Sequence, residues 1–138
     1  MNRSQSTNRR LALWLKRAQA FAFIGLGGWC LIAPGQVEAL SLKPEYQHLT
    51  ATTALLMGCF GAQAILVGAL TLLSGFKAAT FLGFGLLASL PFFVFNVWFV
   101  FVVEMFTALM LVDFVANAGF LAIGLVGWQL MRDEAEPV

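Results

Sequence analysis

Residues 78–131 form a long apolar stretch in which only two side chains, Glu104 and Asp113, are ionisable. A helix that crosses a lipid bilayer needs about 20 consecutive apolar residues. The stretch is therefore long enough to cross a membrane twice, and its two acids fall near the turn that must join the crossings. The sequence predicts an integral membrane protein.

The composition of the whole chain supports this prediction. The 138 residues, the length of one domain, are 60% hydrophobic and 11% charged, whereas soluble proteins carry roughly 25% charged residues. The formal net charge is +1, which gives no excess of positive charge for binding nucleic acid. Membrane lipids are the expected surroundings.

The positions of the cationic residues predict how the chain crosses the membrane. Seven of the eight Lys and Arg residues precede the first apolar run, separate the second from the third, or follow the last. These seven are Arg3, Arg9, Arg10, Lys16, Arg17, Lys77 and Arg132. Cationic segments stay in the cytoplasm, so both termini are expected there and the number of crossings must be even. We therefore predict an all-α, up-down-up-down four-helix bundle in the bacterial inner (cytoplasmic) membrane.

The apolar runs and the breaks between them set the predicted boundaries within this single membrane domain. The expected spans are residues 14–33, 50–73, 78–97 and 110–131, after a disordered tail at 1–10. Residues 34–49 are the one long polar connection, expected on the periplasmic side along the membrane surface, with the second helix beginning near Pro44 because proline suits a first helical turn. Pro91 is expected to kink the third span.

Small residues recur at helical spacing and predict where helices touch. Glycine lets two helix backbones approach closely, and packing drives helix association in lipid. The predicted packing residues are Gly58, Gly61, Gly68, Gly83, Gly124 and Gly127. Gln63, at mid-depth in the second span, is expected to bond a neighbouring helix.

Five polar residues are predicted to meet at the periplasmic level: His48, Asn96, Glu104, Asp113 and Asn117. Asp113 and Asn117 are four residues apart and so share one face of the last helix. An ionisable group at membrane depth is costly and is a default functional candidate. The alternative is structural, with Asp113 bonding a neighbouring helix and Glu104 solvated in the loop.

Motifs for catalysis are missing from the sequence. It contains no Walker loop, dinucleotide fingerprint, nucleophile elbow, HExxH or CxxC, and His48 is its one histidine. We predict neither an enzyme nor a metal site, and no cofactor, while a bound lipid, quinone or pigment stays open. Cys30 and Cys59 are expected to be reduced.

The pattern LVDFVANAGFLAIGLVGW in the fourth span, the small residues of the second and third spans and the late proline of the third resemble small four-helix bacterial membrane proteins of the DoxX-like and related families. Some DoxX-like proteins are associated with quinone-linked sulfur oxidation or with redox partners. No motif of this chain carries those activities over, and Cys30 and Cys59 do not form a redox pair.

Two functions are compatible with these features. The first is a non-catalytic accessory, assembly or stabilising subunit of a larger bacterial membrane complex, because the loops are short and the helices carry seams of small residues. The second is a small-molecule binder or carrier, proton-coupled or specific for a quinone or pigment, which would use the face that carries Asp113 and Asn117.

Overall fold

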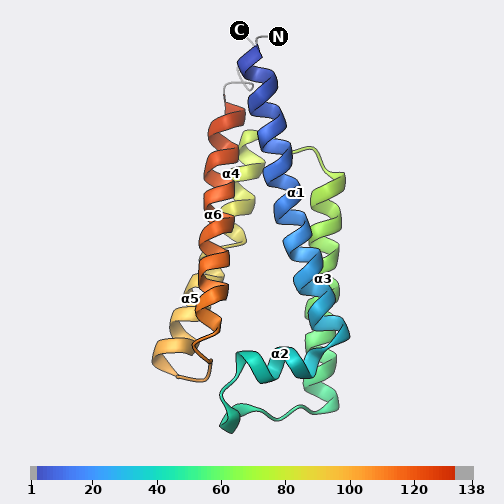
Figure 1. Ribbon diagram of the computed structural model, residues 1–138, viewed down its shortest axis with the longest axis vertical. Coiled ribbons are helices and arrows are strands. Elements are labelled where there is room, and N and C mark those ends of the chain that lie inside the picture. The colour runs from blue at the N-terminus through green and yellow to red at the C-terminus, as the bar shows by residue number, and fades with distance from the viewer. Residues whose placement is uncertain (1–2, 133–138) are drawn as a thin grey trace.

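The computed structural model describes residues 3–132, which form helices joined by short connections (Figure 1). The elements are α1 (Arg3–Ile32), α2 (Pro34–Ser41), α3 (Ala51–Leu73), α4 (Ala78–Leu87), α5 (Leu90–Val97) and α6 (Met110–Arg132), with a 3₁₀ turn at Pro44–Tyr46 and a π-helical turn at Trp98–Val102. Within residues 3–132 the prediction of an all-helical protein is confirmed.

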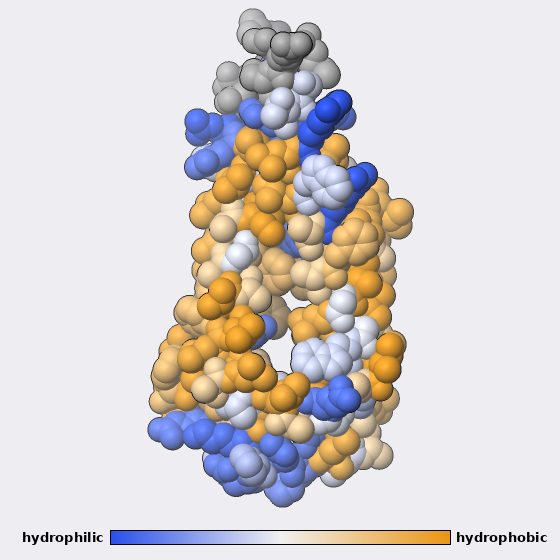
Figure 2. All heavy atoms as spheres, viewed as in Figure 1, coloured by the Kyte–Doolittle hydropathy of each residue, from blue (hydrophilic) through white to orange (hydrophobic). Residues whose placement is uncertain are grey.

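In the part of the chain that the structure describes, three helical segments are long and apolar enough to cross a membrane: Ala51–Leu73, Ala78–Val102 and Met110–Arg132. The pair α1 and α2 adds a fourth candidate if the bent pair is counted as one span. α3 and α6 begin and end within one residue of the predicted spans 50–73 and 110–131. Figure 2 shows an apolar middle with hydrophilic residues gathered toward the two ends of the molecule.

The first helix is longer than predicted. Residues 3–10, expected in a disordered tail, are helical and continue α1; residues 1–2 of that tail lie outside the described part of the chain. Adding residues to an existing helix avoids the unfavourable nucleation step, and no glycine or proline interrupts this segment. The disordered-tail prediction is therefore wrong for residues 3–10.

A sharp corner at Ala33 separates α1 from α2. The two helices are bent by 104°, and Ala33 has φ −133° and ψ 56°. Pro34 disfavours a helical conformation in the residue before it and suits the first position of the next helix. As a result, α2 runs across the end of the molecule (Figure 1), in line with the expected surface segment.

The prediction that the second helix begins near Pro44, outside the span 50–73, is wrong. Pro44 opens only the 3₁₀ turn, and α3 begins at Ala51 after a capping box. In this box the Thr53 backbone N–H donates to Thr50 Oγ1 over 3.2 Å, and the Thr50 backbone N–H donates to Thr53 Oγ1 over 2.8 Å. Two otherwise unpaired backbone donors are satisfied there. The capping box therefore makes Thr50 the N-cap and Ala51 the first residue of α3.

The third span is broken in its middle. α4 ends before Ala88 and Ser89, and α5 resumes at Leu90 with Pro91 in its first turn. Proline lacks an N–H and clashes with the preceding turn, so the break precedes Pro91. The span then ends in the π-helical turn, where the Val103 N–H donates to the Trp98 carbonyl over 2.9 Å.

The long helices associate as two pairs. α1 packs along α3, α4 packs along α6, and α1 also contacts α6. α3 and α4 follow each other in the chain, but they belong to different pairs. Figure 1 shows the pairs close together at the end that carries residues 3 and 132 and farther apart at the opposite end, which α2 crosses.

The close approaches within each pair occur at glycines. A Cβ on Gly61 would lie 2.5 Å from the Gly27 carbonyl oxygen, and one on Gly124 would lie 2.7 Å from the Gly85 Cα. Gly68 meets the Ala20 carbonyl and Gly127 meets the Phe81 ring in the same way. Gly58 makes only an ordinary contact, with Leu31.

Gly83 is not a packing residue. No atom lies within 4 Å of the position its Cβ would take. Gly85, two residues later and therefore about 200° around the helix, makes the close contact with α6 instead. The prediction for Gly83 is wrong because the contact face of α4 is set by Phe81 and Gly85.

The two connections at the splayed end are tied together by backbone hydrogen bonds. The Lys43 N–H donates to the Met105 carbonyl over 2.9 Å, and the Thr107 N–H donates to the Ser41 carbonyl over 2.9 Å. Leu42 and Phe106 form an isolated antiparallel bridge between these bonds. The apolar turn after the third span is thus joined to the 34–49 connection.

Candidate functional site

Three of the five predicted polar residues meet between α5 and α6. Asp113 Oδ2 accepts a hydrogen bond from Asn96 Nδ2 over 2.8 Å and another from Asn117 Nδ2 over 2.9 Å. Asn96 is 1% exposed and Asn117 4% exposed, and Asp113 is half-buried. We call Asn96, Asp113 and Asn117 the polar trio.

Local structure explains how the trio assembles. Asp113 lies in the first turn of α6 and Asn117 one turn later, so both side chains lie on one face. Asn96 lies near the end of α5, whose direction is set by the break before Pro91. The trio therefore depends on how the broken third span returns against α6.

The charge of Asp113 is stabilised by dipoles. None of the Lys and Arg side chains in the described part of the chain forms an ion pair with it. Its stabilising contacts are the two amide donors, helped by the positive end of the α6 dipole, which favours an acid in the first turn. This arrangement holds a carboxylate in place without a cation.

Three buried side-chain atoms of residues 3–132 lack a hydrogen-bond partner, and one of them belongs to the trio. Asn96 Oδ1 is buried without a hydrogen-bond partner. Ser89 Oγ, at the break between α4 and α5, and Gln19 Nε2, in α1, are buried without partners as well. Buried polar atoms are nearly always paired. The unpaired Oδ1 of Asn96 is therefore an open acceptor on a residue that also bonds the Asp113 carboxylate.

Glu104 lies outside the trio. It is exposed, has a left-handed backbone with φ 54°, and its carboxylate lies 3.5 Å from Lys43 Nζ. This pair supports the same two connections that the backbone hydrogen bonds join. Of the two interpretations offered for Glu104, the loop position is the one the structure shows.

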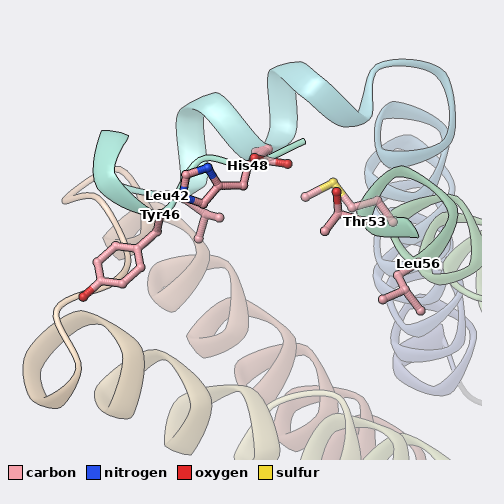
Figure 3. A pocket seen from close by; sticks show the side chains of 7 residues that line it. Leu42, Tyr46, His48, Thr53 and Leu56 are labelled. Atoms are coloured by element: carbon pink, nitrogen blue, oxygen red, sulfur yellow. The ribbon is translucent and has the colours of Figure 1, made fainter. Parts of the chain in front are cut away.

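His48 is also separate from the trio. It lines a cavity of about 290 Å³ between the 34–49 connection and the first turns of α3 (Figure 3). The cavity wall includes Glu38, Leu42, Tyr46, Thr53, Leu56 and Met57. Within residues 3–132 no three His, Cys, Asp or Glu side chains are placed to share a metal ion.

Several polar residues of the interior were not predicted. Glu38 is 3% exposed and Lys16 is 7% exposed, although both occur in segments that read as surface. Lys16 Nζ donates to the carbonyls of Ser74 over 2.7 Å and Leu72 over 3.2 Å. The burial of Lys16 could have been predicted from helical spacing, because Lys16 shares one face of α1 with Ala12, Gln19 and Ala20, which are all buried.

Gln63 departs from its prediction in the opposite direction. It lies in the middle of α3, but its side chain is exposed and has no hydrogen-bond partner within residues 3–132. The glycines of α3 that contact α1 occupy another face of the helix. Gln63 therefore points away from this protein's own helices.

An opening separates the two helix pairs. Figure 2 shows a gap through the molecule between the α1–α3 side and the α5–α6 side, above α2. The pairs converge only toward the other end (Figure 1). In a bilayer such an opening is filled by lipid chains or by another protein.

Comparison with protein-family models, curated proteins and solved structures finds no match to this chain. The resemblance to DoxX-like proteins therefore stays a prediction.

Proposed function

We propose that the protein is a non-catalytic integral membrane protein of the bacterial inner membrane, with four spans and cytoplasmic termini, that acts as an accessory subunit of a larger membrane complex. The observation that carries the proposal is the outward-facing Gln63. An amide without a partner in an apolar environment costs several kcal/mol. A polar group on the helix of a second membrane protein would provide the missing hydrogen bonds.

The surroundings of Gln63 fit such a contact. Cys59, Leu66 and Leu70 are also exposed on α3, and their spacing places them on the same face as Gln63. This face lies opposite the glycine contacts with α1. One side of α3 thus packs within the protein, and the other presents a single amide on an apolar background.

The experiment is photo-crosslinking in native membranes followed by purification in mild detergent. A photoreactive residue at Leu66, beside Gln63, is expected to crosslink a specific membrane protein. The matched control is Val115 on α6, which is 70% exposed and carries no neighbouring amide. Crosslinks to lipid alone from both positions would contradict the proposal, as would migration only as a monomer or homodimer on a native gel.

Replacement of Gln63 tests the hydrogen bond itself. Gln63→Leu is expected to lower the association constant about three-fold or more, since hydrogen bonds between membrane helices contribute about 0.6 to 1.7 kcal/mol. The monomer should be no less stable, because Gln63 has no partner within the described residues. Unchanged assembly of Gln63→Leu would remove the supporting observation.

A second candidate function is a carrier or binder of a small cation, including a proton or protonated amine, at the polar trio. The observation in its favour is that Asp113 has no cationic partner within residues 3–132 while the neighbouring Asn96 Oδ1 is open. A cation there would meet a carboxylate and an amide oxygen. Asp113→Asn is expected to abolish transport or binding while the protein still folds; normal uptake by this variant would exclude the carrier.

A further inference from the structure

A second cavity, of about 160 Å³, lies at the end of the molecule that carries residues 3 and 132. It is bounded by α1, by the turn from α3 to α4 and by the last turns of α6. The residues that matter for its chemistry are Arg9, Lys16, Gly75, Phe76, Phe81 and Met131. Two cations and an apolar wall therefore share one cavity.

Lys16 is the buried cation of this cavity. It is 7% exposed, and its ammonium donates two hydrogen bonds, to the carbonyls of Leu72 and Ser74. An ammonium has three protons, so one donor remains. No carboxylate pairs with Lys16 within residues 3–132, so the groups that face its charge there are the two carbonyls and the Phe76 ring.

Arg9 supplies the second cation at the mouth of the cavity. Arg9 and Lys16 are seven residues apart on α1, which places them on the same helix face with a rise of about 10.5 Å between them. The Arg9 side chain is exposed. A guanidinium binds phosphate oxygens through two parallel donors, whereas Lys binds them as a point charge.

The apolar wall distinguishes a lipid from a free anion. Phe76 lies under the Lys16 ammonium, 5.7 Å from its nitrogen to the ring centroid, and Phe81 and Met131 line the cavity as well. α3 ends and α4 begins within a few residues of this point, so the cavity lies where the apolar spans end. That is the level of lipid headgroups.

We propose that this cavity binds the phosphate headgroup of an anionic phospholipid. Arg9 binds the phosphate at the mouth, Lys16 attracts it from the floor, and the acyl chains run down beside Leu13 and Met131. Basic pockets between membrane helices are the sites at which anionic headgroups bind. The volume equals that of about five waters at roughly 30 Å³ each, enough for a phosphate diester group.

The test is native mass spectrometry of the full-length protein titrated with phosphatidylglycerol and with phosphatidylcholine of the same acyl chains. The unmodified protein is expected to bind phosphatidylglycerol about five-fold more tightly or better, as one Lys or Arg near an anionic headgroup contributes about 1 kcal/mol. Equal affinity for the two lipids would overturn the proposal.

Two variants with the same loss of charge locate the site. Arg9→Gln is expected to lower the affinity for phosphatidylglycerol about five-fold. Arg10→Gln removes a neighbouring exposed cation that does not line the cavity and should lower it less than two-fold. Similar losses in both variants would mean diffuse surface attraction and would overturn the site.

A competition step separates a lipid from a free anion. Inorganic phosphate added at millimolar concentration should not displace phosphatidylglycerol, because it gains nothing from the apolar wall. Displacement would show a simple anion site and would overturn the lipid assignment. The test does not depend on Lys16, whose replacement also removes hydrogen bonds to the end of α3.

Discussion

At the residue scale, Asp113 is the centre of the polar trio, because its Oδ2 accepts hydrogen bonds from both Asn96 and Asn117. The four-residue step from Asp113 to Asn117 placed both on one face, and they share a hydrogen bond. Asn96, His48 and Glu104 were predicted to join them because all lie at one level, and of these three only Asn96 bonds Asp113. The depth of a residue in the membrane does not determine which neighbouring helix its side chain faces. His48 accordingly lines a separate cavity.

The hydrogen bond between Asn96 and Asp113 can be measured by a double-mutant cycle. The variants Asn96→Ala and Asp113→Ala, alone and combined, are expected to show a coupling of about 1 kcal/mol, between the mean of about 0.6 and the maximum of about 1.7 kcal/mol found in membrane proteins. Unfolding in SDS gives the free energies. The control cycle pairs Asn96→Ala with Val115→Ala, whose exposed side chain should show no coupling. Additive effects of the Asn96→Ala and Asp113→Ala substitutions on the free energy of unfolding would contradict a stabilising hydrogen bond between the two residues.

Lys16 should contribute to stability independently of any lipid. Lys16→Met removes two hydrogen bonds from a charged donor to the last carbonyls around α3, and such bonds contribute about 1.5 to 3 kcal/mol each. We expect a loss of about 3 to 6 kcal/mol in the free energy of unfolding, measured in a detergent that lacks anionic lipid. Arg17→Met, on the exposed side of α1, is the control and should change it little.

At the element scale, the ends of α3 and α6 could be predicted because hydropathy changes abruptly there. The break in the third span could be predicted only approximately: Pro91 forbids a regular helix, but the distribution of the distortion over Ala88 and Ser89 depends on packing against α6. The length of α1 could not be predicted from polarity, because residues 3–10 are polar and still helical.

The contact between α4 and α6 can be tested with two glycines, Gly124 of α6 and Gly83 of α4. Gly124→Ala places a methyl group against Gly85 and is expected to destabilise the protein by about 1 to 3 kcal/mol, the usual cost of overpacking. Gly83→Ala, with free space around it, should be neutral or stabilising by up to about 1 kcal/mol. Thermal unfolding in detergent compares them, and equal effects would contradict the assigned face.

At the scale of the whole molecule, a seam of small residues shows that a helix approaches another closely, but it does not name the partner. A short turn at 74–77 joins α3 to α4, yet α3 packs on α1 and α4 on α6. The complementary contacts, Gly61 with Gly27 and Gly124 with Gly85, lie far apart in the sequence. Their pairing is set by shape in three dimensions.

The proposed orientation predicts which connections a membrane-impermeant thiol reagent reaches. In a variant that lacks Cys30 and Cys59, a cysteine at exposed Glu45 should be labelled from outside intact spheroplasts, since the 34–49 connection is expected on the periplasmic side. A cysteine at exposed Gly75 should be labelled only after permeabilisation, because cationic segments remain cytoplasmic. The reverse pattern would invert the proposed topology.

The splayed arrangement of the two helix pairs has a mechanical consequence. If the apolar helices cross a bilayer as proposed, a body that is narrow at one end and wide at the other (Figure 1) displaces more area from one leaflet than from its opposite. In a flat bilayer this difference stretches one monolayer relative to the other, and bending the bilayer relieves it. A wedge of this shape therefore favours membrane of one sign of curvature, and the backbone ties between the 34–49 connection and the turn at 103–109 keep its wide end from changing width.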